Sequence, residues 1–410
     1  MKSWDWTTIG DSCELTSGGT PSKNNPHFWI GDLPFISARD LKSDRIEDGL
    51  LHIASDAVEK SSAKIAPVGS LLMLVRGMGL ANGIQIGEVT SPVAFNQDIR
   101  AIHPPSTIIP RFLLLALRSS FLNGEGERVL SSAAHGTLKI DTDALRQIAI
   151  PVPPIPEQRR IVGILDEAFA GIATAKANAE KNLRNARALF ESHLQGLFNH
   201  QSIGLADRKF GDRTLLEIID GDRGSNYPKA DDFSDEGHCL FLNTKNVRPD
   251  GFSFESRMFI TAAKDAELRK GKLKRDDVLL TTRGTVGNIA HYSHDVPFDH
   301  IRINSGMLVL RPDKNTLLPA YLFELLRSDI VKNQIRAQTT GAAQPQLPIK
   351  TLVNFVLPVP TSLHDHRGIV DKLRAVEPET RRLESLYEQK VAALDALKKS
   401  LLHQAFAGKL

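Results

Sequence analysis

The chain has 410 residues, which is too long for one ordinary domain, so two or three domains are expected. Hydrophobic residues make up 41% and charged residues 24%, proportions that exclude a disordered chain and allow a sizeable buried core. The net charge of +3 excludes nucleic-acid binding through bulk positive charge, so any DNA surface must be a local concentration of lysine and arginine.

The two cysteines, Cys13 and Cys239, stand apart and form no Cys-x-x-Cys or Cys/His cluster. This pattern argues against a disulfide framework and a structural zinc site. The first residues carry no apolar signal segment, and the longest apolar runs are far shorter than a membrane span. We therefore expect a cytoplasmic protein without membrane contact.

Residues 1–152 form the first predicted globule. Short β-like runs at residues 69–75 and 96–102 alternate with turn signals, and residues 111–120 favour a helix. Glycine-containing loops with polar and basic side chains connect these elements, at residues 17–25, 76–82 and 135–139. The pattern predicts a mixed α/β globule.

Residues 153–203 contain a long predicted helix that runs from Glu157 to Phe198. Pro154 and Pro156 suit its start, where a helix has no use for the missing amide donor. About forty residues give a rod on the order of 60 Å. Its apolar residues recur in steps of three and four, as a narrow stripe suited to packing on another helix. The stripe comprises Ile161, Leu165, Ala168, Ile172, Ala175, Ala179, Leu183, Ala186, Phe190, Leu194 and Leu197.

The second half repeats this plan. Residues 204–359 form a second predicted globule, with strands at 277–282 and 303–310 and a helix at 320–333. Residues 360–410 contain a second long helix from Arg367 to Phe406 with a similar apolar stripe. Pro378 is expected to kink or break that helix.

The repeat is visible in the sequence itself. Residues 145–153 (Leu-Arg-Gln-Ile-Ala-Ile-Pro-Val-Pro) recur 207 residues later at 352–360 (Leu-Val-Asn-Phe-Val-Leu-Pro-Val-Pro). Along the helices the offset is 208 and constant, so Leu165 matches Leu373. Framework segments such as 71–77 and 278–284 also correspond, whereas the polar residues between them do not. Two copies of so long a period indicate a duplication.

The predicted fold class is α+β or mixed α/β, with two similar globules alternating with two long helices. A stripe this long and narrow outruns a globule of about 150 residues. We therefore expect the two helices to pair as an antiparallel coiled coil, which gives the chain an internal pseudo-twofold repeat. The alternative is that each helix packs only on its own globule.

Catalytic machinery for DNA is missing from the sequence. It has no Asp/Asn-Pro-Pro-Tyr/Phe motif of a DNA methyltransferase and no GxxxxGK[ST] phosphate loop for an ATP-driven motor. The nearest approach to a nuclease site, Asp250 followed by Glu267 and Arg269, lacks the lysine. The histidines show no metal-binding spacing. No catalytic or metal-binding residue is predicted, and the protein is not expected to be an enzyme by itself.

Three motifs carry a family resemblance. Residues 150–162 read Ile-Pro-Val-Pro-Pro-Ile-Pro-Glu-Gln-Arg-Arg-Ile-Val and lead directly into the first long helix. Residues 18–21 read Gly-Gly-Thr-Pro, and residues 283–287 form an Arg-Gly-x-x-Gly loop. Together with the duplication, these features resemble the specificity subunits of type I restriction–modification systems over essentially the whole chain. The second junction departs, because residues 360–367 lack the Glu-Gln pair, although Thr361 or Ser362 can still cap the helix.

The resemblance implies a pair of target recognition domains, each of which reads half of a bipartite site in double-stranded DNA. It also implies that the helices act as a spacer between the domains and as a docking surface for two methyltransferase (M) subunits. Restriction (R) subunits then join the complex. S-adenosylmethionine, ATP and Mg are expected on these partners, and no cofactor is expected in this chain.

We expect the DNA contacts to come from polar and basic side chains of the loops, which supply donors and acceptors to phosphates and base edges. Arg76 and Arg283 are the strongest candidates, because they occupy equivalent positions beside glycine at strand ends. The candidates in the first globule are Thr20, Lys23, Asn24, Arg39, Lys42, Arg76, Asn82, Asn96, Gln97 and Lys139. Those in the second are Lys245, Asn246, Arg283, Thr285, Asn288, Asn304, Gln338 and Gln344.

Two other functions are compatible with parts of this pattern. One is the recognition module of a different DNA methyltransferase system. The other is a coiled-coil scaffold that binds only protein, which would explain the helices. A scaffold would not explain why the two globules share a framework and differ in their loops.

Overall fold

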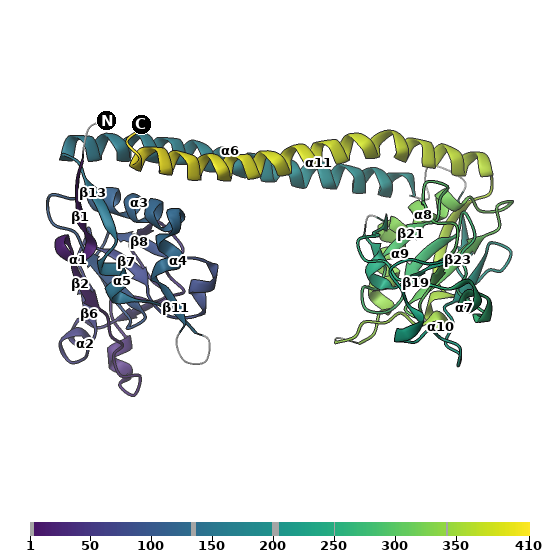
Figure 1. The fold of residues 1–410 in the computed structure, drawn as a ribbon, viewed down its shortest axis with the longest axis horizontal. Coiled ribbons are helices and arrows are strands. Elements are labelled where there is room, and N and C mark those ends of the chain that lie inside the picture. Colours follow the sequence, from purple (N-terminus) through teal and green to yellow (C-terminus); the bar gives the residue numbers. More distant parts are fainter. Residues whose placement is uncertain (1–3, 133–136, 199–204, 250, 342) are drawn as a thin grey trace. The chain divides into compact units, whose positions relative to one another are not determined.

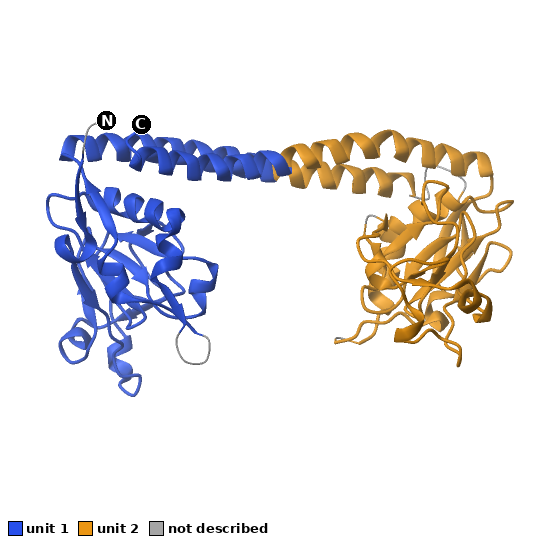
Figure 2. Cartoon of the chain, in the orientation of Figure 1, with its two compact units in different colours: residues 1–180, 388–410 blue, residues 181–387 orange. Residues whose placement is uncertain are grey.

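The computed structural model describes residues 4–132, 137–198, 205–249, 251–341 and 343–410. The chain divides into two compact units (Figure 2). Unit 1 comprises Met1–Glu180 and Glu388–Leu410, and unit 2 comprises Lys181–Tyr387. Each unit therefore contains one globule and a stretch of both long helices. In the described part of the chain, no helix combines the length and apolar character needed to cross a membrane.

The long helices are α6 (Ile155–Leu197) and α11 (Leu363–Phe406), which lie side by side within each unit (Figure 1). In unit 1, Lys176 Nζ lies 2.7 Å from Asp395 Oδ1. In unit 2, Arg187 Nε lies 3.5 Å from Glu384 Oε2. Partner numbers fall along α11 as they rise along α6, so the helices run antiparallel. The predicted antiparallel pairing is confirmed.

Buried residues of α6 recur every seven positions, as a coiled-coil seam requires. Leu165, Ile172, Ala179 and Ala186 are all at most 8% exposed. The small alanines in this seam allow the helix backbones to approach closely. Only part of the predicted stripe is buried: Leu183, at an intervening position, is half-exposed.

The ends of the helices also pack on the globules. In unit 1, Ile161 of α6 and Leu402 of α11 belong to the main core of the globule. In unit 2, Leu194 of α6 and Phe198, which directly follows α6, join Leu373 of α11 in the corresponding core. The two packing schemes considered from the sequence therefore coexist.

The expected break at Pro378 does not occur, because α11 continues through it. A proline removes one intrahelical hydrogen bond. The Thr380 hydroxyl donates to the carbonyl oxygens of Val376 and Glu377, at 3.2 and 2.9 Å. Leu373 and Thr380, on either side of the proline, are 1% and 2% exposed. Packing on both sides thus holds the helix together.

Two main sheets and two smaller strand pairs form the globule of unit 1 among the described residues. The larger consists of β2 (Glu14–Ser17), β4 (Arg45–Ile46), β7 (Leu71–Leu74), β8 (Ile86–Val89) and β10 (Ile99–His103), in the order β2-β10-β7-β8-β4. The second consists of β3 (Leu33–Ile36), β5 (Leu51–Ile53), β6 (Lys64–Ala66) and β9 (Val93–Phe95), in the order β5-β3-β9-β6. Every residue of β7 is buried, as its unbroken apolar run suggests.

The globule of unit 2 repeats this arrangement. Its larger sheet consists of β15 (Leu216–Asp220), β20 (Val278–Thr281), β21 (Ile289–His291) and β23 (Met307–Pro312), in the order β15-β23-β20-β21. Its second sheet consists of β16 (Cys239–Leu242), β19 (Phe259–Ile260) and β22 (Ile301–Ile303), in the order β19-β16-β22.

Both globules are closed by pairing their first strand with their last. In unit 1, β1 (Asp5–Thr8) pairs antiparallel with β13 (Ala149–Val152). In unit 2, β14 (Leu205–Lys209) pairs with β24 (Val356–Pro360) in the same way. The last strand leads directly into the long helix, so this pairing anchors the start of α6 and α11 to its globule.

Helices cover the sheets and confirm the predicted mixed α/β class. The predicted helix of unit 1 is α3 (Pro110–Ser120). Its counterpart is split into α8 (Pro319–Arg327) and α9 (Asp329–Gln338), so the single helix expected at 320–333 is wrong. Ser328 is extended, with ψ 154°, and its hydroxyl donates to Leu325 O. The other α-helices and strands of the described residues are α1 (Ile9–Ser12), α2 (Ser55–Glu59), α4 (Gly126–Val129), α5 (Thr142–Arg146), α7 (Ala262–Glu267), α10 (Ile349–Leu352), β11 (Leu130–Ser132), β12 (Leu138–Ile140), β17 (Val247–Arg248) and β18 (Gly251–Phe252).

Candidate nucleic-acid interface

One edge of the sheets in unit 1 gathers many of the predicted residues. Strand β10 runs antiparallel to both β2 and β7, so the ends of β2 and β7 meet the start of β10. Thr20 follows β2, Arg76 follows β7, and Asn96 and Gln97 precede β10. The Thr20 hydroxyl donates to Gln97 Oε1 at 2.5 Å, which links two of these loops.

The second sheet contributes to the same edge. Strands β3 and β9 are parallel and end together, because Ile36 is in register with Phe95. The backbone amide of Asn96 then donates to Ile36 O at 3.0 Å. The exposed Arg39 and Lys42 lie in the loop that follows β3. Polar and basic loops from both sheets thus share this edge, which we call the loop edge.

A backbone bridge brings Arg76 and Lys139 together at the loop edge. The Gly77 amide donates to Leu138 O at 3.1 Å, and the Ile140 amide donates to Val75 O at 2.8 Å. Gly77 has φ 119°, a conformation that favours glycine, which accounts for the glycine after Arg76.

Unit 2 builds the same bridge 207 residues later. Arg283 is bridged to Gln346. The Gly284 amide donates to Pro345 O at 3.1 Å, and the Leu347 amide donates to Thr282 O at 2.9 Å. The equivalence of Arg76 and Arg283, inferred from sequence, therefore extends to their backbone contacts. The side chains opposite them differ: lysine in one unit and glutamine in the other.

Asn96 and Asn304 occupy matching turns before β10 and β23. Asn304 Oδ1 accepts a hydrogen bond from the Gly306 amide at 2.9 Å, and Asn96 Oδ1 accepts one from the Asp98 amide at 3.2 Å. The backbone amide of Asn304 donates to Leu242 O at 2.9 Å, so this turn joins the two sheets of unit 2. Each asparagine shapes its turn through its side-chain oxygen, Asn96 at the loop edge of unit 1 and Asn304 at the equivalent loop edge of unit 2.

The other candidates occupy loops of their own globule. Lys23 and Asn24 lie between β2 and a 3-10 turn at Pro26–Trp29, and Asn82 ends the 3-10 turn Met78–Asn82. Thr285 and Asn288 lie between β20 and β21, and Gln338 is the last residue of α9. The following residues are exposed: Lys23, Asn24, Arg39, Lys42, Arg76, Asn82, Gln97, Lys245, Arg283, Thr285, Gln338 and Gln344. The predicted loop at 135–139 begins outside the described residues.

Asn246 is a correction to the candidate set. It is 2% exposed, although its neighbour Lys245 is exposed. Its side-chain amide donates to Ser253 O and Ser256 O, at 3.1 and 2.7 Å, and its Oδ1 accepts from the Asn243 amide at 3.0 Å. The side chain is therefore used to hold its own loop. Asn288, which is half-buried, similarly donates to Val247 O at 2.9 Å.

Two arginines at the loop edges were missed. Arg100 lies in β10, one residue into the strand, and Arg223 follows β15. Arg223 is exposed and forms an ion pair with Asp220 at 3.0 Å. A signal for Arg100 was available, because an arginine there interrupts the apolar residues of a strand whose repeat carries Leu308.

The junction before each long helix is held by one buried side chain. Gln158, 0% exposed, accepts from the Ile109 amide at 2.8 Å and donates to Pro153 O at 2.8 Å. In unit 2 the equivalent residue is His366, also 0% exposed. Its Nδ1 accepts from the Leu318 amide at 3.4 Å and its Nε2 lies 3.1 Å from Pro360 O.

These contacts explain the departure at the second junction. A histidine that accepts at Nδ1 and donates at Nε2 reproduces the acceptor and donor of a glutamine amide. Burial lowers the pKa of His366, which keeps the ring neutral, as this arrangement requires. The predicted cap is confirmed, because Ser362 Oγ accepts from the His364 amide at 3.1 Å.

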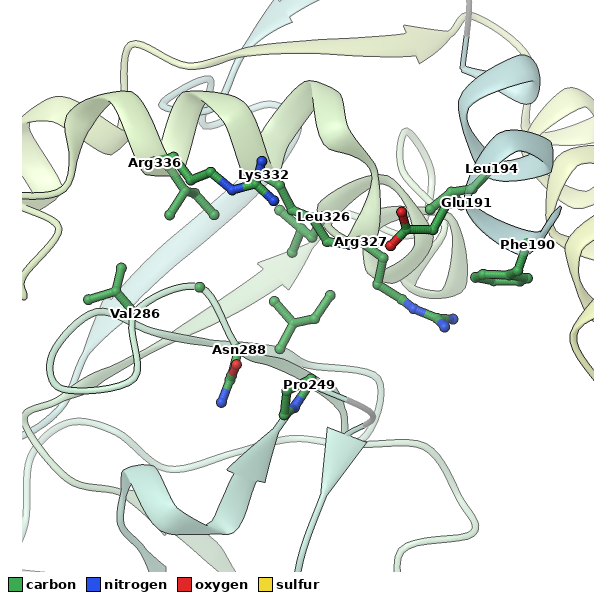
Figure 3. Close-up of a pocket in the computed structure, with 13 residues that line it drawn as sticks. Phe190, Glu191, Leu194, Pro249, Val286, Asn288, Leu326, Arg327, Lys332 and Arg336 are labelled. Carbon is green, nitrogen blue, oxygen red and sulfur yellow. Dashed lines mark ion pairs between the residues drawn. The ribbon is translucent and has the colours of Figure 1, made fainter. Parts of the chain in front are cut away.

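A groove of about 400 Å³ lies beside α6 in unit 2 (Figure 3). Arg327 points toward Phe190 of α6, with its guanidinium carbon 4.9 Å from the ring centre. Lys332 Nζ lies 3.9 Å from Glu191 Oε1. The far wall is the turn between β20 and β21, which includes Val286. We call this the α6 groove.

Unit 1 has a matching groove of about 590 Å³ beside the end of α11. Leu402 takes the place of Leu194, Lys398 that of Phe190, and the turn between β7 and β8 forms the far wall. Leu122, 54% exposed, also lines this α11 groove, and Lys398 Nζ lies 5.1 Å from the Phe169 ring centre. Both grooves therefore join a globule to the C-terminal part of a long helix, with different side chains.

Metal-binding clusters are absent from the described residues: no group of three or more His, Cys, Asp or Glu side chains could hold an ion. The two cysteines are buried and unbonded. Burial raises the pKa of Cys239 to about 12, so this thiol is protonated and poorly nucleophilic at neutral pH.

Comparison with known proteins gives consistent results. A family model described as "Type I restriction modification DNA specificity domain" matches the chain twice, at residues 1–183 and 208–391. The type I restriction enzyme MjaIX specificity subunit of Methanocaldococcus jannaschii is 23% identical over 427 residues, covering 100% of this chain and 94% of that protein. The EcoR124I/EcoR124II specificity subunit of Escherichia coli is 33% identical over 166 residues, which are 40% of each chain.

Solved structures share the fold. A chain from the structure described as "Structural basis underlying complex assembly and conformational transition of the type I R-M system" has a TM-score of 0.77 at 19% identity, covering 100% of this chain and 99% of that one. The HsdS subunit from Thermoanaerobacter tengcongensis has a TM-score of 0.57 at 20% identity, covering 99% and 97%. The twofold match of the family model spans most of the sequence, and the chain belongs to the type I restriction–modification DNA specificity family.

Proposed function

We propose that this chain is the DNA-recognition subunit of a type I restriction–modification complex. Its two target recognition domains, residues 1–152 and 204–359, each read one half of a bipartite target in double-stranded DNA. The observation that carries this proposal is the loop edge. It occurs once in each unit with the same backbone contacts, but the two copies carry different side chains. A protein-only scaffold would have no use for that arrangement.

The differences between the loop edges correspond to different half-sites. Lys139 faces Arg76, whereas Gln346 faces Arg283. Lysine donates only, whereas glutamine both donates and accepts, so the two sets of side chains suit different base edges and phosphates. The chain therefore recognises an asymmetric target.

Partner subunits supply the chemistry. Two methyltransferase subunits dock on one chain, one at the α6 groove and one at the α11 groove, because the two grooves occupy equivalent positions. Restriction subunits join this complex. These partner subunits bind S-adenosylmethionine, ATP and Mg. The role of this chain is DNA recognition. The segments 153–203 and 360–410 serve as the spacer between the domains, and a cytoplasmic location stays a prediction.

Substitution of the two equivalent arginines tests the proposal. Arg283→Ala should weaken or relax recognition in one half-site and leave the other unchanged, and Arg76→Ala should affect the opposite half. A lost bidentate base contact should cost roughly 1–3 kcal/mol at one base position, whereas a lost phosphate contact lowers affinity uniformly. The measurement is a genome-wide map of methylated sites in cells expressing each variant with its partners.

Arg128→Ala provides a control, because Arg128 pairs with Glu125 at 2.6 Å and is not among the loop-edge residues. It should leave both half-sites unchanged. If Arg76→Ala and Arg283→Ala alter the same half, the assignment of one half-site to each domain is wrong.

A further inference from the structure

Arg100 occupies a position at the loop edge of unit 1 that unit 2 fills with an apolar residue. In β10, Arg100 pairs with Met73 of β7. In β23, Leu308 pairs in the same register with Leu280 of β20. Leu308 is 1% exposed and belongs to the core of its globule. One globule thus carries a guanidinium where the other carries a buried leucine.

The guanidinium of Arg100 is incompletely satisfied within the chain. Its Nη1 donates to Ser17 Oγ, and its Nη2 donates to Thr142 Oγ1 at 3.3 Å. Its Nε is buried and meets no hydrogen-bond partner in the described part of the chain. Burial lowers the pKa of Arg100, and the like charge of Arg146 lowers it further. A partly buried cation without a counter-ion is costly, so this site favours an anion from outside the chain.

The side chain lines a small cleft that collects further positive charge. The cleft has a volume of about 290 Å³, and Arg76 and Lys139 also line it. The bridge between these two residues holds them at its wall. Asp141 and Asp143 also line the cleft, but in the described part of the chain no ion pair joins either of them to Arg100, whose electrostatic environment is set by burial and Arg146. Asp141 Oδ1 instead accepts from the Asp143 and Ala144 amides, at 3.0 and 2.9 Å.

We propose that this cleft binds a backbone phosphate of the DNA, with Arg100 as its principal donor, and that unit 2 has no counterpart. The inference rests on the proposed function and adds a specific contact to it. A guanidinium presents a fork of N–H donors that matches a phosphate oxyanion. Arg100 is tethered to Ser17 and Thr142, so it suits a fixed phosphate better than a base edge deep in a groove. At this position the first domain gains a phosphate contact that Leu308 cannot supply in unit 2.

Arg100→Leu tests this directly, because it copies the residue that the second globule carries. The full chain, assembled with its partner subunits, is titrated with two duplex oligonucleotides, one with the mapped target and one without it, at several KCl concentrations. The Arg100→Leu complex should bind both duplexes about tenfold more weakly than the wild-type complex does. The slope of log K against log salt should become shallower by about 0.9, the value for one phosphate contact. Arg100→Lys should retain most of the slope.

Arg128→Leu is the matched control, because it removes the same charge from unit 1 at a residue that does not line the cleft. It should leave affinity and salt slope unchanged. Arg100→Leu should not lower the thermal midpoint, since the repeat tolerates leucine at this position. A lower midpoint with unchanged DNA binding would overturn the proposal, because Arg100 would then be structural.

Two further outcomes are distinguishable. If the loss is confined to one base pair of the target and the salt slope is unchanged, Arg100 reads a base and the phosphate assignment fails. If the wild-type complex binds neither duplex, the proposed function itself fails. If the wild-type complex binds DNA and the Arg100→Leu complex gives the same titration curves, only the phosphate assignment of the cleft is rejected.

Discussion

One buried residue at each junction links a globule to the start of its long helix. Gln158 and His366 make equivalent contacts with the amide before α3 or α8 and with the carbonyl of the preceding proline. The motif around Gln158 is recognisable in the sequence, whereas the second junction lacks the Glu-Gln pair and offers no recognisable replacement. Only the three-dimensional contacts show that a histidine can replace the glutamine, because both offer one acceptor and one donor.

His366 should make the second unit sensitive to acid. Burial lowers its pKa below the ordinary 6.5, while the bond to Pro360 and the charge of Asp365 oppose the shift. The unfolded chain therefore takes up a proton at higher pH than the folded chain. The stabilising contribution of the neutral ring is complete above pH 6.5 and is lost as the pH falls below it toward the folded pKa.

His366→Gln should keep the two hydrogen bonds and abolish this loss. We expect a change in the free energy of unfolding of under about 1 kcal/mol at pH 7, and a smaller decline than wild type at pH 5–6. His366→Leu should cost about 1–3 kcal/mol, because the Leu318 amide and Pro360 carbonyl lose their partner. Hydrogen–deuterium exchange of peptides spanning α8, measured against pH, reports the effect in unit 2.

Tryptophan fluorescence supplies the control, because Trp4, Trp6 and Trp29 all lie in unit 1 and there are no others in the chain. Unfolding followed by tryptophan should be the same for wild type and His366→Gln. Equal acid sensitivity of α8 in the two proteins would show that His366 is not the titrating group.

Candidate residues were harder to predict than the junction. Loop position, polarity and the repeat were enough to place Arg76 and Arg283 at matching loop edges. The same criteria selected Asn246, whose amide is used inside its own loop. Sequence cannot distinguish these cases, because an asparagine in a turn can face solvent or bond to nearby backbone. Arg100 is not among the candidates because it lies in strand β10, whereas the candidates were sought in loops.

Among the elements, the strongly periodic ones were predicted best. The long helices were recognised from their stripes, and β7 and β20 from their apolar runs. Errors arose where tertiary contacts outweighed a local signal: α11 continues through Pro378 because it is packed on both sides, and Ser328 divides a helix that local propensity would continue. The participation of both helix ends in the globule cores was likewise non-local.

The grooves beside α6 and α11 give an element-scale prediction. A charge placed in either should remove one methyltransferase subunit, because a buried unpaired carboxylate is expensive at an interface. Leu122→Glu, in the α11 groove, should give complexes with one such subunit per chain instead of two. Val286→Glu, in the α6 groove, should do the same, and the double variant should bind none. Native mass spectrometry of the purified complexes measures the stoichiometry.

Leu50→Glu is the control, because Leu50 is 72% exposed in unit 1 and does not line the groove. It should leave two methyltransferase subunits in place. If Leu122→Glu and Leu50→Glu give the same full stoichiometry, the partner does not dock at the α11 groove.

For the whole molecule, the duplication carries most of what the sequence could predict. Two equal globules and two equal helices follow from a constant offset. That offset does not reveal that each compact unit combines a globule with parts of both helices, so that the last residues of the chain complete the core of the first globule. This arrangement couples each globule to both helices, which the proposed spacer role of the helices requires.

In the proposed function, two domains read separate half-sites and the paired helices set the distance between them. Inserting seven residues after Glu180 and seven after Lys390 adds one heptad at positions that face each other in the register of the Lys176–Asp395 and Arg187–Glu384 pairs, and preserves the seam. The insertion lengthens each helix by about 10 Å, or roughly 3 base pairs of DNA. Inserting seven residues in α6 alone should instead disrupt the pairing.

Mapping the methylated sequences produced by this paired insertion is the most direct test. Both half-site sequences should stay unchanged while the unread spacer grows by roughly 3 base pairs. A methylated target with the original spacer, or with altered bases in either half-site, would contradict this expectation.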